Sequence, residues 1–193
     1  MTPPERAAPG DGPAMPEGLV SHLIHTCIVC TDFERSLDFY TRVLGAKVGG
    51  VVSSGEAGPL AAAMGAPQRS RWRGAMLYWG DPARTSLVDL IAYEGGGAGE
   101  DGEGRDGAGA GAAPERTAVD PGLARLCLRV RDVEAAAAQL RANEVELVSP
   151  QPLDLTIEGR LHRVLFFRDP DGTLLEFSER VGPSHRERAS GDR

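Results

Sequence analysis

The sequence predicts an α+β fold built from two copies of one unit, in which a strand is followed by a helix and then by three further strands. Apolar periodicity indicates this order of elements within residues 22–93 and again within residues 121–180. The two segments also match position by position at their first strand, at the start of their helix and at their last strand. An internal duplication is the simplest explanation of both observations.

The first unit opens with Leu23–Cys30, an apolar and β-branched run of strand length, and Thr31–Glu34 then has the spacing of a helix capping box. Gly45 ends the predicted helix. Three strands follow, which we expect at 46–53, 72–79 and 85–93. The helix carries one apolar stripe at intervals of four, three and four residues: Phe33, Leu37, Tyr40 and Leu44.

The second unit repeats this order. Leu123–Val130 is the predicted first strand, Asp132 the N-cap, and an alanine-rich helix runs to about Asn143. The next strands are expected at 145–149, 161–168 and 173–179, and Asp169–Gly172 has the residues of a type I turn between the last two.

Between the units, glycine is concentrated: nine of the 25 glycines fall within 95–116, a stretch without apolar periodicity. Such a segment buries too little surface to offset its ordering entropy. We therefore expect a flexible linker over 94–120 and loose tails at 1–21 and 181–193, which leaves one domain over 22–180 made of modules 22–93 and 121–180.

The overall composition narrows the classes of function. Of the 193 residues, 41% are hydrophobic, and 21 basic against 28 acidic side chains give a net charge of −7. Net acidity without a clustered basic stripe disfavours nucleic acid and an anionic membrane surface as partners. No apolar run approaches the ~20 residues of a membrane-spanning helix, and the first residues lack the apolar segment of a signal peptide. The three cysteines form no disulfide framework, so we expect a cytoplasmic protein.

Alternation divides the first strand of each unit into two faces. In the second unit Leu126, Leu128 and Val130 form an apolar set that should pack beneath the helix, so Arg125 and Arg129 point the other way.

By the repeat, Thr26 and Ile28 are expected under the first helix and His25 on the opposite face. On the last strands, Asp89 and Glu176 each lie between two large apolar residues and so also face away from the helix. If the two sheets face one another, His25, Asp89, Arg125 and Glu176 converge on a shared cleft.

These residues carry a resemblance. His25–Tyr40 continuing to Val43–Gly45, together with Arg168–Phe177, resembles the vicinal oxygen chelate superfamily, which includes glyoxalase I, bleomycin-binding proteins and extradiol dioxygenases. The resemblance implies two βαβββ modules that form a cupped mixed sheet around a central cleft. It also implies a divalent metal (Mn, Fe, Zn or Ni), no nucleotide cofactor, and a site built within one chain or across a homodimer. We expect a small-molecule ligand and a homodimer.

Carried over by position, the metal ligands of the resemblance correspond to His25, Asp89, Arg125 and Glu176. Arg125 departs from the pattern, because a guanidinium stays protonated and has no lone pair for a metal. Two alternatives remain open. Either His25, Asp89 and Glu176 hold the metal alone, or Arg125 replaces it by pairing with Glu176.

The preferred functional prediction is a metal-dependent lyase or isomerase acting on a small oxygenated molecule. Glu176 or His162 would move a proton and Arg125 would pair with a substrate oxygen, while Phe166 and Trp79 contact the substrate. Arg125 disfavours the glyoxalase reaction itself and extradiol cleavage. The alternative is a metal-free binding protein of the bleomycin-resistance type. Two questions stay open. His162 lies either at the surface or in the cleft, and segment 52–70 is either a lid over the site or a loop without a role in it.

Overall fold

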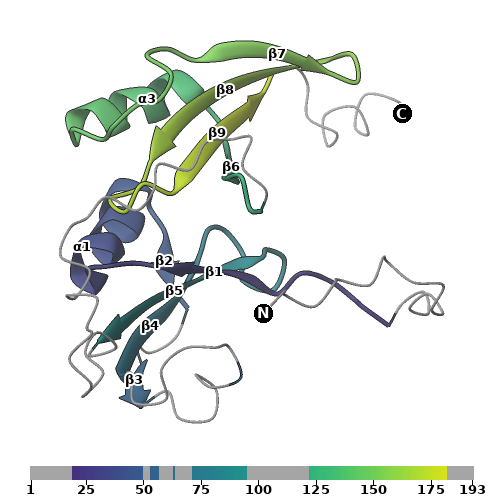
Figure 1. Ribbon diagram of the computed structural model, residues 1–193. Coiled ribbons are helices and arrows are strands. Elements are labelled where there is room, and N and C mark those ends of the chain that lie inside the picture. Colours follow the sequence, from purple (N-terminus) through teal and green to yellow (C-terminus); the bar gives the residue numbers. More distant parts are fainter. Residues whose placement is uncertain (1–18, 50–52, 57–62, 64–70, 95–121, 182–193) are drawn as a thin grey trace, which may run out of the picture.

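Each half of the chain folds into one sheet with a helix against one of its faces, as Figure 1 shows. The computed structural model describes residues 19–49, 53–56, 63, 71–94 and 122–181. The predicted linker and both predicted tails lie outside these residues apart from their ends, and so does most of 52–70. The α+β prediction with two strand–helix–strand modules is confirmed.

The first module is a five-stranded sheet in which β5 lies between β1 and β4. β1 runs parallel to β5, and β4 is antiparallel to β5. The short strands β2 and β3 both pair with β4. The strands are β1 (His25–Val29), β2 (Lys47–Val48), β3 (Ser53–Glu56), β4 (Arg71–Tyr78) and β5 (Leu87–Glu94).

The helix of the first module begins as α1 (Phe33–Asp38) and continues as the π-helical turn η1 (Phe39–Val43). Asp32 is its N-cap, and its carboxylate accepts a hydrogen bond of 3.1 Å from the Arg35 amide. The predicted capping box at Thr31 is therefore wrong by one residue. Gly45 follows the helix with a φ of 70°, a left-handed conformation that favours glycine.

The second module repeats the topology with four strands in the order β6-β9-β8-β7. β6 runs parallel to β9, and the other two pairs are antiparallel. α3 (Val133–Ala142) begins at the predicted N-cap, because the Asp132 carboxylate accepts a hydrogen bond of 2.9 Å from the Ala135 amide. The strands are β6 (Leu126–Val130), β7 (Leu153–Ile157), β8 (Arg160–Arg168) and β9 (Leu174–Arg180).

Two strand predictions were wrong. The predicted strand 46–53 is reduced to the two residues of β2, and β3 begins where it was expected to end. Segment 145–149 contributes only an isolated bridge from Leu147 to Phe167. The strand between α3 and β8 is instead β7, which begins just after Pro150 and Pro152 and lies at the edge of the sheet.

The two modules share one hydrophobic core, which runs from the first sheet through both helices to the second sheet. They also meet through hydrogen bonds between α1–η1 and the turn that joins β8 to β9. The buried Tyr40 hydroxyl donates a hydrogen bond of 2.9 Å to the Asp169 carboxylate, and the Ser36 hydroxyl donates one of 3.1 Å to the Asp171 carboxylate. Arg35 adds a contact of 2.9 Å to the same Asp171 carboxylate. The turn of one module is thereby fixed to the helix of the other.

Candidate functional site

Each sheet has one face that its helix does not cover, and we call this its open face. The open face of the first sheet carries His25, Cys27 and Asp89, whereas Ile28 and Leu90 are buried on the other face. The open face of the second sheet carries Arg125, Cys127 and Glu176, together with residues of β8. The alternation read from the sequence therefore places all four predicted ligand positions on open faces.

On the first sheet, Cys27 and Asp89 are directly paired across β1 and β5, and His25 lies two residues before Cys27. Burial raises the pKa of the half-buried Asp89 carboxyl, and the neighbouring His25 partly offsets this. Burial, with a smaller contribution from Asp89, also raises the pKa of the Cys27 thiol. The first module thus supplies an imidazole and a carboxylate close to each other.

On the second sheet, the equivalent positions form an ion pair. The Arg125 Nε donates to Glu176, whose side chain is only 8% exposed, whereas that of Arg125 is 46% exposed. The Arg125 guanidinium also lies 5.7 Å from the centre of the Phe166 ring, which is paired with Glu176 across β8 and β9. The second of the two alternatives for Arg125, pairing with Glu176, is the arrangement seen.

The exposed Cys127, which the sequence pattern did not single out as a site residue, completes this cluster. It pairs with Glu176 across β6 and β9, on the same face of the sheet. Burial and the adjacent Glu176 raise the pKa of the Cys127 thiol to about 11. The repeat was the available signal, because Cys27–Asp89 and Cys127–Glu176 are equivalent strand pairs.

His162 lies on the same open face of the second sheet. Because side chains alternate between the faces of a strand, His162 faces the same side of β8 as Val164 and Phe166, and Phe166 is the residue paired with Glu176. The His162 Nδ1 lies 3.5 Å from the Ser178 hydroxyl. Four of the predicted functional residues, Arg125, His162, Phe166 and Glu176, therefore share one surface.

The predicted metal site is not assembled by the described residues of one chain. Among the residues the structure describes, no three His, Cys, Asp or Glu side chains are close enough together to hold a metal ion. His25 and Asp89 belong to one sheet and Glu176 to the other, where its carboxylate is engaged by Arg125. The donor groups of one chain therefore do not fit the predicted metal centre.

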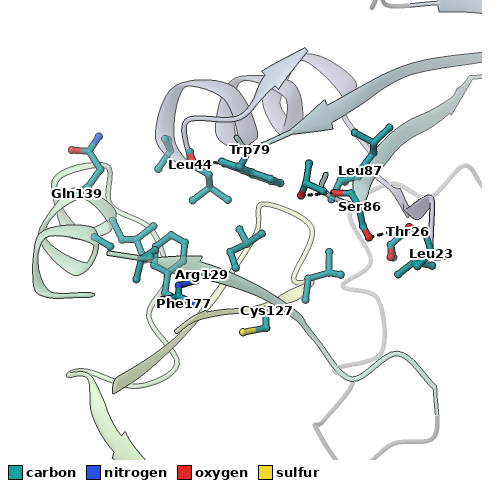
Figure 2. A pocket seen from close by; sticks show the side chains of 18 residues that line it. Leu23, Thr26, Leu44, Trp79, Ser86, Leu87, Cys127, Arg129, Gln139 and Phe177 are labelled. Carbon is teal, nitrogen blue, oxygen red and sulfur yellow. Dashed lines mark hydrogen bonds between the residues drawn. The ribbon is translucent and has the colours of Figure 1, made fainter. Parts of the chain in front are cut away.

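Between the modules lies a different cavity of about 620 Å³, shown in Figure 2. Its apolar lining comes mostly from the helix-side faces, with residues such as Val88, Leu128 and Phe177, and Cys127 and Arg129 of β6 border it as well. Trp79 lines it as well, with its indole N–H donating 2.7 Å to the Leu44 carbonyl. The prediction that Trp79 shares a surface with Arg125 and Phe166 does not match this placement, because Trp79 continues the helix-side alternation of Leu77.

The helices of the described part of the chain are all too short or too polar to span a membrane.

Comparison with solved structures shows the same fold in glyoxalase-family proteins. A glyoxalase family protein from Bacillus cereus superposes with a TM-score of 0.66 at 18% identity, covering 88% of this chain and 100% of that one. For the trypanothione-dependent glyoxalase I of Leishmania major the TM-score is 0.50 at 20% identity, and the match covers 90% of this chain and 95% of that one. A glyoxalase family protein from Enterococcus faecalis superposes with a TM-score of 0.50 at 18% identity, covering 82% of this chain and 98% of that one.

A search of curated protein sequences gives no significant match. The family model, by contrast, matches residues 22–177, which span both modules and the segment between them. The chain therefore belongs to the Glyoxalase/Bleomycin resistance protein/Dioxygenase superfamily.

Proposed function

We propose that the chain binds a small oxygenated molecule through Arg125 on the open face of the second module, without a metal at that position. The observation that supports this proposal is the Arg125–Glu176 ion pair, formed by two residues that the family resemblance assigns to metal-ligand positions. The resistance-type members of the superfamily named in the family description are the nearest functional class.

The geometry favours a ligand with a carboxylate or carbonyl oxygen next to an apolar ring. Glu176 accepts from the Nε of Arg125, and nearly half of the Arg125 side chain is exposed, so the outer edge of the guanidinium faces the open surface. A guanidinium binds a carboxylate in two parallel hydrogen bonds, which fixes its orientation. The Phe166 ring beneath Arg125 offers an apolar surface beside it.

Calorimetric titration with benzoate tests this assignment, because benzoate is a minimal ring with a carboxylate. Arg125→Lys should weaken binding at least fivefold, since Lys lacks the two-pronged donor geometry. Arg84→Lys is the matched control, because Arg84 lies outside both open faces and is 79% exposed. Equal affinities of the two variants would contradict the proposed contact.

Treatment with EDTA separates this function from a second candidate. Unchanged benzoate affinity after EDTA supports a metal-free site, whereas loss of binding supports a metal-dependent one.

The second candidate is a metal-dependent lyase or isomerase whose site is completed by another copy of the chain. It is favoured by the proximity of His25 and Asp89 on the open face of the first module. In a homodimer that joins this face to the second module of the other copy, these two groups would meet Glu176 of the partner subunit. Arg125 and His162 would then lie beside the substrate, as predicted from the sequence.

The metal content of the purified protein and of a His25 variant decides this candidate. It requires stoichiometric metal in the purified protein and loss of that metal in His25→Ala, whereas metal retained in His25→Ala would eliminate His25 as a ligand.

A further inference from the structure

We propose that the cavity between the two modules is a second binding site, which takes a small neutral molecule with an aromatic or aliphatic ring. This inference does not rest on the function proposed for the open faces, because most of the apolar lining comes from the helix-side faces of the sheets, although Cys127 and Arg129 of β6 also border the cavity.

The size and the walls of the cavity suit a small molecule. Its volume of about 620 Å³ lies within the roughly 300–1,000 Å³ of ligand pockets. The first module contributes Leu44, Trp79 and Val88, and the second contributes Leu126, Leu128 and Phe177. Walls from both modules of one chain surround this volume, which is too small for a second copy of the chain.

Incomplete burial of β6 explains why the cavity exists. Leu126, Leu128 and Val130 are apolar and point to the helix side, yet all three are only half-buried. Within the described residues, α3 packs mainly over β8 and β9 and so covers β6 only in part. These side chains stay in contact with water in the free protein, and an apolar ligand would remove them from it.

Trp79 provides a fixed aromatic wall. Its indole N–H donates to the carbonyl of Leu44, which is the C-cap of the π-helical turn η1. Short π-helical turns are uncommon and are frequent at functional sites. Figure 2 shows Trp79 and Leu44 together on the side of the first module that borders the cavity.

The charge of the walls favours a neutral ligand. Arg129 is the one charged residue among the described residues that line the cavity. It alternates with Leu128 and Val130 along β6, so its side chain belongs to the open face. An ionic group placed between the modules would therefore lose its hydration without gaining a partner.

Fluorescence tests the site directly, because the chain has only two tryptophans. In a full-length Trp72→Phe protein, Trp79 is the sole donor. Titration with the neutral probe N-phenyl-1-naphthylamine should quench Trp79 emission through energy transfer, saturating at one probe per chain.

Two variants on α3, made in the Trp72→Phe background, locate the bound probe. Ala136 lines the cavity, so Ala136→Phe should fill it and lower probe affinity at least tenfold. Ala138 is exposed on the same helix and is absent from the lining, so Ala138→Phe should leave affinity within twofold. Should Ala136→Phe fail to fold, Leu126→Phe takes its place, since Leu126 lines the opposite part of the wall.

Equal probe affinity in the filling and control variants would overturn the proposal. Binding without energy transfer from Trp79, or no saturable binding at all, would overturn it as well.

Discussion

At the scale of single residues, the two halves of the duplication have kept their geometry and changed their chemistry. Cys27–Asp89 and Cys127–Glu176 are equivalent pairs between the first and last strands of their modules. In the first module the nearby residue is His25, and in the second it is Arg125. A guanidinium neutralises a buried carboxylate, whereas a neutral imidazole has a lone pair to share with a metal, and we propose that this one difference alters what the second module binds.

The elevated pKa of Cys127 gives a residue-scale prediction. Burial and Glu176 raise the pKa of its thiol from 9.0 to about 11. At pH 8 the fraction present as thiolate should therefore be about a hundredfold smaller than for an ordinary cysteine. In a Cys27→Ser, Cys30→Ala background, Cys127 should react slowly with a disulfide reagent although the residue is exposed.

Glu176→Gln is the matched change for this prediction. It removes the carboxylate charge beside the thiol, so the reaction should accelerate and its pH midpoint should fall. A rate in the parent that already equals that of free cysteine would contradict the assignment.

At the scale of elements, the turn between β8 and β9 holds the modules together. The Tyr40 hydroxyl donates to one oxygen of the buried Asp169 carboxylate, and the amides of Asp171 and Thr173 donate to the other. Tyr40→Phe should lower the free energy of unfolding by about 1–3 kcal/mol, because it leaves a buried acceptor without its donor.

Urea unfolding measures this cost. Tyr78→Phe is the control, since Tyr78 is only half-buried, and it should change stability by less than about 0.5 kcal/mol. A cost for Tyr40→Phe no larger than that of the control would mean that the turn does not hold the modules together.

Burial within the repeat gives a second element-scale prediction. Ile28 is 5% exposed, whereas its counterpart Leu128 is half-buried at the cavity. Ile28→Ala should therefore cost about 2–5 kcal/mol, the range of buried aliphatic truncations, and Leu128→Ala about 1 kcal/mol. Equal costs in thermal or urea unfolding would show that Leu128 is covered in solution.

The elements whose signals are local could be predicted from the sequence. Asp132 starts the second helix as predicted, and the start of the first was misplaced by only one residue, from Asp32 to Thr31. Asp89 and Glu176 reveal the faces of their strands because each lies between apolar residues. β7 was missed although Leu153, Leu155 and Ile157 alternate, because an apolar run just before the prolines gave a competing pattern. The placement of the modules depends on long-range contacts such as Tyr40–Asp169, which no local pattern encodes.

At the scale of the whole molecule, the open faces leave apolar surface that a second copy would cover. Val29 is 59% exposed on the open face of the first sheet, and Leu155 is 46% exposed on β7. We expect a homodimer in light scattering and a shift to monomer in Val29→Asp, because a charge there opposes burial of that face. Val20→Asp is the control, since Val20 is 71% exposed outside both sheets. A dimer that persists in Val29→Asp would exclude this face from the interface.

The expected dimer and the ion pair together make the functional alternatives separable through Arg125→His. This change removes the cation that pairs with Glu176 and supplies a neutral imidazole beside the freed carboxylate. If a second copy brings His25 and Asp89 to that face, the variant should retain about one Mn or Zn per chain after dialysis, while the parent retains far less. Adding Val29→Asp should abolish that gain, because half of the ligands then come from a partner that no longer binds. Stoichiometric metal in the parent would instead favour the metal-dependent enzyme, and equal metal in the single and double variants would place the ligands within one chain.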